Sequence, residues 1–588
     1  LASNSSWQTA ITDREVRMVK RDRNHPSVLF WSLGNECGAA SNFSSAKTEM
    51  TKYDSRPIFY CNEDKNVSYS DLHSNMYPTV NATSSKSSGA YGKPYFICEY
   101  AHAMGQAVGN LKEYWDVIES STGIIGGCIW DWVDQSIYKP SDLVNGTKTK
   151  NGFHNWASGY DYNSTSGINY GFQGNFLNNG IITPDRAWTS KLTEVKKVYS
   201  NVTFSKNGNT LTVKNKNSFI DLSGYMLTYQ LLCDGCLQEE GILSTPSATA
   251  GNSAYVTLPS FSTDNDHEYL LNVQLRLKNS TLWADAGYIV ADEQFSLTGR
   301  KEVTAGNHTA NEGSVSVSGN TVNITTKDGK KSTISFSNGK LNSWNYNGTD
   351  LIYAAPDFNS YRDIDNDRWS GSFQKSTSTS VTSSLTKEGN VAKMSMKEGG
   401  SIYTIDYIIY PDATIDMKVT FNSSSNYRRV GLGMQFPGGF ENVEYYARGP
   451  WSNYVDRKTG SYLGRYVTTV DDMIEENIHP QTYGDHQDLR ELILSNGNAA
   501  LTIKTGGNVA YSLSHYDETQ YCGTGDTMWS DGTHWYDLTK SNQIFAHFDY
   551  WQRGLGNGSC GGDSCLDQYL CPSGSYSYTL RFTPTSLK

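Results

Sequence analysis

The sequence predicts a multidomain fold of the α/β plus all-β type, and three observations support this prediction. The chain has 588 residues, several times the roughly 150 residues of a typical domain. Apolar, strand-like runs alternate with helical stretches up to about residue 197, and short alternating strands with turn pairs follow. We therefore expect the C-terminal part of a (β/α)₈ TIM barrel, then an immunoglobulin-like β-sandwich, then a large C-terminal β-sandwich.

The barrel prediction rests on five apolar runs. Strands are expected at residues 28–33, 57–60, 71–77, 95–99 and 129–132, with a helix at residues 109–120. Each strand ends in polar or aromatic residues, and the carboxyl ends of the strands form the active site in such barrels. Because five strands cannot close an eight-stranded barrel, we expect residues 1–197 to hold strands four to eight. The missing N-terminal half is expected upstream, possibly as a separate or cleaved chain.

Two β-sandwiches are expected after the barrel. Asn-Gly and Asp-Gly pairs, which favour two-residue hairpins, occur at residues 207–208, 234–235, 338–339 and 347–348. Residues 269–277 and 401–410 alternate between apolar and polar side chains, as half-buried strands do. A stretch rich in Ser, Gly and Thr near residues 298–319 divides the two. We expect an immunoglobulin-like sandwich at residues 198–297 and a large sandwich at residues 298–588.

Charge and hydropathy argue against two classes of partner. The 49 basic and 60 acidic residues leave a net charge of -11, which repels a polyanion, so nucleic-acid binding is not expected. No apolar run approaches the eighteen or so residues that span a bilayer, so no membrane segment is expected. The 10 cysteines are too few for a disulfide scaffold. Four lie in or beside apolar runs, where packed thiols are expected: Cys37, Cys61, Cys98 and Cys128.

Two glutamates form the candidate catalytic pair. Glu36 and Glu99 each lie at the end of an apolar strand, so a barrel would bring them to the same rim. Hydrolysis of a glycosidic bond with retention needs two carboxyl groups about 5–5.5 Å apart, one protonated and one ionised. The alternative for each glutamate is a solvated or salt-bridged carboxylate at a strand end.

Longer motifs surround both glutamates. RDRNHPSV at residues 21–28 leads into WSLGNE at 31–36, and CEYAHAMG at 98–105 precedes GCIWDWVDQS at 127–136. These segments closely resemble the acid/base, nucleophile and last-strand segments of family 2 glycoside hydrolases, in particular the large bacterial-type β-galactosidases. The resemblance covers essentially the whole chain and sharpens in two C-terminal segments, ARGPWSNYVDR at 447–457 and QRGLGNGSCG at 552–561.

The resemblance implies a retaining exo-β-galactosidase that hydrolyses terminal non-reducing β-D-galactosides by double displacement through a galactosyl-enzyme intermediate. Glu36 would be the general acid/base and Glu99 the nucleophile. The residues implied to contact the β-galactoside are Asn35 at the hydroxyl next to the reacting carbon, Tyr77 at the nucleophile, His102 at sugar hydroxyls, and Trp130 with Met76 against the galactose ring. A homo-oligomer is also expected from the resemblance.

Two metal ions are implied in the same way. FLNNG at residues 176–180 resembles the segment that gives a sodium ion, Na+, the backbone carbonyl of Phe176 and the side chain of Asn179. Glu36 would be one ligand of a magnesium ion, Mg2+, whose other protein ligands come from upstream strands. Hard cations prefer oxygen ligands of this kind.

One departure from the family pattern bears on aglycone preference and transglycosylation. Family members lend a tryptophan from the C-terminal sandwich to the sugar pocket, and here Gly558, Ser559 and Cys560 stand at the matching place. Trp529 or Trp535 could substitute. The alternatives to a β-galactosidase are a β-glucuronidase or β-mannosidase of the same family, and a non-catalytic carbohydrate-binding or structural assembly protein.

Overall fold

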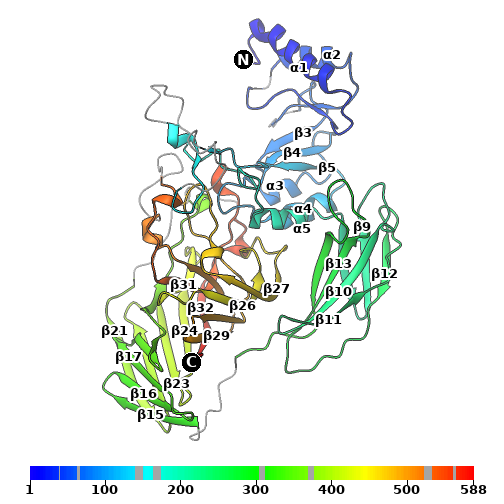
Figure 1. The fold of residues 1–588 in the computed structure, drawn as a ribbon. Coiled ribbons are helices and arrows are strands. Elements are labelled where there is room, and N and C mark those ends of the chain that lie inside the picture. Colours follow the sequence, from blue (N-terminus) through cyan, green and yellow to red (C-terminus); the bar gives the residue numbers. More distant parts are fainter. Residues whose placement is uncertain are drawn as a thin grey trace.

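The computed structural model describes residues 1–38, 40–61, 66–138, 150–162, 174–303, 312–367, 377–521, 533–560 and 565–588. Helices gather in the N-terminal third, and the rest of the chain is built from strands (Figure 1). No helix within the described ranges is long and apolar enough to cross a membrane.

The barrel region, defined here as residues 1–198, contains the α-helices of the described chain. Its helices are α1 Gln8–Asp22, α2 Asn42–Met50, α3 Val80–Ser84, α4 Leu111–Ser120 and α5 Ser190–Val198. Its strands are β1 Trp31–Ser32, β2 Ile58–Phe59, β3 His73–Met76, β4 Tyr95–Tyr100, β5 Ile124–Ile129, β6 Ile137–Tyr138 and β7 Trp156–Ala157. β1 pairs with β2 in parallel, and β4 pairs in parallel with β3 and β5. Parallel pairs with intervening helices form the β/α pattern that the sequence predicts.

The last predicted strand of this region was placed wrongly. The strand expected at residues 129–132 lies at 124–129 and ends before Trp130. Glycines at 126 and 127 interrupt the apolar pattern that would reveal it. Gly127 packs so closely on β4 that an added Cβ would lie 3.0 Å from the Ile97 side chain, so the contact between the two strands favours glycine.

The prediction of packed thiols was also wrong for one pair. Cys61, which follows β2, and Cys98, within β4, form a disulfide with a Cα–Cα distance of 5.9 Å. Cys37 and Cys128 are free cysteines. The disulfide joins the two small parallel sheets of the barrel region directly beside Glu99.

The middle sandwich, residues 202–296, consists of two antiparallel sheets with strand orders β12-β9-β8 and β11-β10-β13-β14. Its strands are β8 Val202–Asn207, β9 Thr210–Asn215, β10 Tyr225–Cys233, β11 Cys236–Ile242, β12 Ser253–Thr257, β13 Tyr269–Leu277 and β14 Ile289–Ser296. Fully buried leucines such as Leu211 and Leu227 form the core. The predicted Asp-Gly hairpin joins β10 to β11, with Asp234 at a φ of 47°.

The C-terminal region, residues 312–588, contains three further sheets that share one hydrophobic core. Nine strands form the order β21-β22-β23-β24-β32-β29-β28-β26-β27, five form β15-β16-β17-β18-β19, and four form β20-β25-β31-β30. The strands are β15 Gly313–Ser318, β16 Thr321–Thr326, β17 Lys331–Ser337, β18 Lys340–Tyr346, β19 Thr349–Asp350, β20 Ala354–Asn359, β21 Val381–Glu388, β22 Val391–Glu398, β23 Tyr403–Ile409, β24 Ile415–Ser423, β25 Arg429–Phe436, β26 Asn442–Gly449, β27 Tyr462–Thr469, β28 Glu491–Ser495, β29 Ala499–Gly506, β30 Ala510–Ser514, β31 Ile544–Gln552 and β32 Gly574–Ser586.

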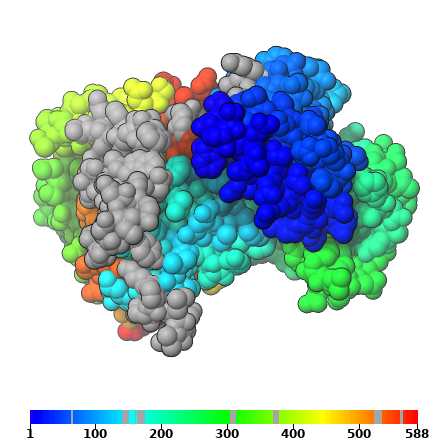
Figure 2. Space-filling view, turned by 90° about the horizontal axis from the view of Figure 1, so that it is seen from above, coloured from blue at the N-terminus to red at the C-terminus, as the bar shows by residue number. Residues whose placement is uncertain are grey.

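The C-terminal region holds the segment that follows the predicted nucleophile. Arg457 donates from Nη1 to the carbonyl of Ala107 at 3.1 Å, and Asn557 donates from Nδ2 to the carbonyl of Gly109 at 2.7 Å. A Cβ at Gly109 would lie 2.1 Å from the Asp456 carboxylate, so only glycine permits this approach. The view from above shows the N-terminal residues in blue between the green middle sandwich and the yellow-to-red C-terminal region (Figure 2).

Candidate active site

Glu99 lies near the C-terminal end of β4, a strand whose six residues are all buried. Only 8 % of Glu99 is exposed. Tyr77 directly follows β3 and has a left-handed φ of 47°. Its backbone N–H donates to the Glu99 carbonyl at 2.7 Å, and its hydroxyl donates to Glu99 Oε2 at 2.8 Å. The parallel strands β3 and β4 therefore bring a hydrogen-bond donor onto a buried carboxylate.

Glu36 lies beyond the end of β1 and is exposed, as is Asn35 before it. Burial raises the pKa of Glu99, the hydrogen bond from Tyr77 lowers it, and the negative charge of Glu36 raises it. The negative charge of Glu36 thus acts on Glu99 and opposes its ionisation.

His102 is fully buried, and its ring lies 6.0 Å from that of Tyr77. Its Nδ1 lies 2.8 Å from the Ser559 hydroxyl, its Nε2 lies 3.4 Å from Asn179 Nδ2, and its ring stacks on Phe176 at a centroid distance of 5.1 Å. Burial lowers the pKa of His102 to about 3. The imidazole is therefore neutral near pH 7, with one donor and one acceptor nitrogen.

Trp130 and Met76 border the same strand ends. Trp130 directly follows β5 and is 37 % exposed. The backbone N–H of Trp130 donates to the carbonyl of Tyr100 at 3.1 Å, and its backbone carbonyl accepts from the Ala103 N–H at 2.9 Å. These bonds connect Trp130 to the segment around Glu99. Met76, the last residue of β3, pairs with Glu99 in the sheet register. An indole and a thioether at this rim offer an apolar surface of the kind that sugar rings pack against.

Asn179 and Phe176, the predicted sodium ligands, contact each other. Asn179 Nδ2 donates to the Phe176 carbonyl oxygen at 3.0 Å, so the amide nitrogen faces this carbonyl. Asn179 Oδ1 is buried and has no hydrogen-bond partner within the described chain. A buried oxygen without a donor costs free energy, and a hard cation would satisfy it.

Glu36 does not form a magnesium site with the described residues. Within the ranges that the structure covers, no group of three or more His, Cys, Asp or Glu side chains is arranged to hold a metal ion. Glu36 is therefore the one predicted magnesium ligand in this part of the chain.

Ser559 and Cys560 are site residues to which the sequence assigned no role. Both lie in the short 3-10 helix Gly558–Cys560, and Ser559 is separated from His102 by 457 positions. Burial raises the pKa of the Cys560 thiol, a hydrogen bond with Tyr77 lowers it, and the negative charges of Glu99 and Glu36 raise it. The residues that stand where the family has a tryptophan thus reach both His102 and Tyr77.

The two tryptophans considered as substitutes have different positions. Trp535 is 2 % exposed and packs among aromatic rings that include Phe153 and Tyr483, with its Nε1 donating to the Asn477 carbonyl at 2.8 Å. It therefore serves the core and offers no ring to a sugar. Trp529 lies outside the described residues.

Family models match three successive segments of the chain. The TIM barrel domain of glycosyl hydrolases family 2 matches residues 1–204, domain 4 of beta-galactosidase matches residues 211–298, and the beta galactosidase small chain matches residues 326–582. The three matches follow one another along the chain and leave few of its residues unmatched. All three parts of the chain are thus similar to parts of family 2 glycoside hydrolases and their beta-galactosidases.

Curated relatives carry a more particular name. A beta-galactosidase of Photobacterium profundum is 27% identical over 99% of this chain and 59% of its own length. One of Priestia megaterium is 28% identical over 94% of this chain and 54% of its own length, and one of Vibrio cholerae is 29% identical over 99% and 58%. The chain thus spans somewhat more than half the length of these relatives.

Proposed function

We propose that this chain carries the active-site residues of a retaining exo-β-galactosidase. One observation carries the proposal: Glu99 is a buried carboxylate at a strand end, bonded by Tyr77 at 2.8 Å and influenced by the charge of Glu36. Two coupled carboxyl groups at one rim are what double displacement at an anomeric carbon requires. The names of the relatives favour galactose as the sugar.

The two glutamates divide the chemistry. Protonated Glu36 gives its proton to the leaving-group oxygen while ionised Glu99 attacks the anomeric carbon and forms a galactosyl ester. Glu36 then takes a proton from water, which attacks the ester and releases galactose with retained configuration. Burial raises the pKa of Glu99, so the Tyr77 hydrogen bond, which lowers it, is the contact that favours the ionised nucleophile.

The remaining predicted residues would bind the sugar. His102 would meet a sugar hydroxyl at Nε2, where the sugar would join or replace the Asn179 amide that lies 3.4 Å away, since Ser559 occupies Nδ1. Asn35 contacts the hydroxyl next to the reacting carbon, where a hydrogen bond strengthens as positive charge develops. Trp130 and Met76 pack on the apolar face of the galactose ring.

A sodium ion would be held by the Phe176 carbonyl and Asn179, and when bound it offers a hydroxyl of the substrate a hard positive charge. The chain's own contribution is to hold the Asn179 side chain between His102 and the Phe176 carbonyl. The homo-oligomer and the upstream strands stay predictions.

Covalent labelling tests the nucleophile. A 2-deoxy-2-fluoro-β-D-galactosyl fluoride reacts with the protein at its full natural length, and mass spectrometry of peptides locates the ester. We expect the adduct on Glu99 and none in Glu99→Gln, whereas Glu113→Gln, a matched change in α4, keeps it. An adduct on a different residue, or labelling that persists in Glu99→Gln, overturns the assignment.

Initial rates on nitrophenyl β-galactoside, β-glucuronide and β-mannoside test the sugar. We expect the galactoside to have the highest kcat/KM by at least tenfold. A higher value for either of the other sugars would assign the site to that glycoside, and no turnover of any of them would favour a non-catalytic binding protein.

A further inference from the structure

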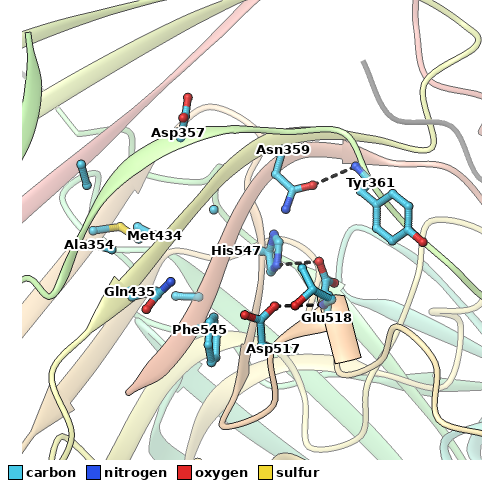
Figure 3. Close-up of a pocket in the computed structure, with 14 residues that line it drawn as sticks. Ala354, Asp357, Asn359, Tyr361, Met434, Gln435, Asp517, Glu518, Phe545 and His547 are labelled. Carbon is cyan, nitrogen blue, oxygen red and sulfur yellow. Dashed lines mark hydrogen bonds and ion pairs between the residues drawn. The ribbon is translucent and has the colours of Figure 1, made fainter. Parts of the chain in front are cut away.

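A second cavity lies in the C-terminal region, on the four-stranded sheet β20-β25-β31-β30. Its volume is about 470 Å³, within the range of small-molecule sites. Residues from three adjacent strands and from the segment around Glu518 line it, and none belongs to the candidate active site. Figure 3 shows its side chains converging from the sheet and from the loop that bears Asp517 and Glu518.

The hollow exists because one strand position has no side chain. Side chains of alternate residues face the cavity, and Gly433 stands in the sheet between Asp357 on β20 and His547 on β31. A Cβ at Gly433 would lie 3.5 Å from Asn359 and 3.7 Å from His547, which is ordinary contact. Neither backbone conformation nor crowding therefore requires glycine here. Glycine in a strand interior weakens the strand, and one frequent reason for it is the close approach of a ligand.

Uncommitted amide groups border the hollow. Gln435 makes no side-chain hydrogen bond within the described residues, and Asn359 uses only its Oδ1, which accepts from the Tyr361 N–H at 2.8 Å. Each amide therefore retains donors, and Gln435 also retains an acceptor. The ring of Phe545 lies in the same lining, next to Gln435 in the sheet register. Paired donors and acceptors beside one aromatic ring match a molecule with hydroxyls on its edge and C–H groups on its face.

The charges around the cavity leave no cation for an anionic ligand. Glu518 is paired with the fully buried Arg429 at 3.0 Å and with His547 at 3.4 Å. Asp357 is paired with Lys340 at 2.5 Å. Asp517 accepts a hydrogen bond from the Thr519 N–H and has no ion-pair partner in the described chain. Phosphorylated or carboxylated ligands would meet uncompensated negative charge, so a neutral polyol ring fits best.

We propose that this cavity is a second saccharide site, which binds a neutral pyranose through Gln435, Asn359 and Asp517 with Phe545 against one face of the ring. The site lies in the C-terminal region and has its own lining, so it does not depend on the catalytic assignment. It would retain a sugar unit of a substrate or product away from the catalytic carboxylates.

Hydrogen exchange tests the proposal because it reports on each site separately. D-galactose, D-glucose and D-mannose are titrated into the protein at its full natural length, and amide exchange is followed in peptides of β20, β25 and β31. We expect at least one of these sugars to slow exchange there in a saturable way. Peptides of β3, β4 and β5 report on the active site, so a failure of the proposed function is seen independently. Unchanged exchange in β20, β25 and β31 with all three sugars would overturn the second site.

A substitution that fills the hollow provides the decisive variant. Gly433→Val places two methyl groups in the cavity without strain in the backbone, and we expect at least tenfold weaker saccharide protection in these peptides. The matched control is Gly506→Val in β29, where an added Cβ also meets its nearest atom at 3.5 Å but lies outside the cavity. If Gly433→Val unfolds, Gln435→Ala removes the amide instead. Equal protection in the control and the cavity variant contradicts the proposal.

Discussion

The two predicted catalytic glutamates lie in contrasting surroundings. Glu99 is buried on β4, accepts a hydrogen bond from Tyr77 and lies next to a buried His102 that Ser559 contacts. Glu36 lies beyond a two-residue strand and is exposed in the described structure. The nucleophile side is thus completed by residues of this chain, including its last part. The difference teaches that this chain fixes the position of Glu99 by direct contacts, whereas Glu36 acts on Glu99 through its charge.

The largest expected effect separates the two roles. Glu36→Gln removes the proton donor, so we expect kcat/KM to fall by about 10²–10⁴-fold for a substrate with a poor leaving group. A dinitrophenyl galactoside needs little protonation and should lose far less, and added azide should restore turnover by attacking the galactosyl ester. Steady-state rates with both substrates make the test. If Glu99→Gln shows this pattern instead, the roles of the two glutamates are exchanged.

The second expected effect concerns the Tyr77 hydrogen bond. Tyr77→Phe removes a hydrogen bond to a charged carboxylate, which contributes about 1.5–3 kcal/mol, so we expect kcat/KM to fall by roughly 10–100-fold. Loss of the donor raises the pKa of Glu99, and since the ionised form attacks, the acid limb of the pH profile moves to higher pH. The matched control is Tyr114→Phe, whose hydroxyl donates to the Pro78 carbonyl at 2.7 Å. An acid limb that does not move in Tyr77→Phe would contradict the role of Tyr77.

The smallest expected effect concerns Ser559 as a positioning residue. Ser559→Ala removes the partner of His102 Nδ1, which corresponds to about 1 kcal/mol, so we expect a roughly fivefold rise in KM with little change in kcat. The pH profile stays unchanged because His102 is neutral throughout. Ser332→Ala, which removes the acceptor of the Trp344 Nε1 hydrogen bond at 3.0 Å, should lower the melting temperature without changing KM. An unchanged KM in Ser559→Ala would show that His102 is held in place without Ser559.

Local patterns predicted much of the fold from the sequence. Four apolar runs coincide with the parallel strands β1 to β4, and the Asn-Gly and Asp-Gly pairs mark hairpins with positive φ values at Asp234, Asn338 and Asn347. These features depend on neighbouring residues, which the sequence displays directly. The sequence did not reveal strand β5 in its place, because Gly127 serves a contact with β4 that no local pattern shows.

The candidate site was predictable only in part, because some of its contacts join residues that are far apart in the sequence. The positions of Glu36 and Glu99 at strand ends follow from apolar runs, and the motif resemblance supplied their roles. The Cys61–Cys98 bridge depends on which strands become neighbours, and the contact of Ser559 with His102 joins positions 457 apart. Contacts of this kind are fixed by tertiary packing and leave no periodicity in the sequence.

The attachment of the C-terminal region to residues 101–110 has a consequence for the order of assembly during folding. Asn557 contacts Gly109 across 448 positions, and Ser559 contacts His102 across 457. The backbone around the predicted nucleophile therefore reaches its final geometry only after the C-terminal region has packed against it. A variant in which that region fails to pack would keep both glutamates and still lose the contacts that hold His102.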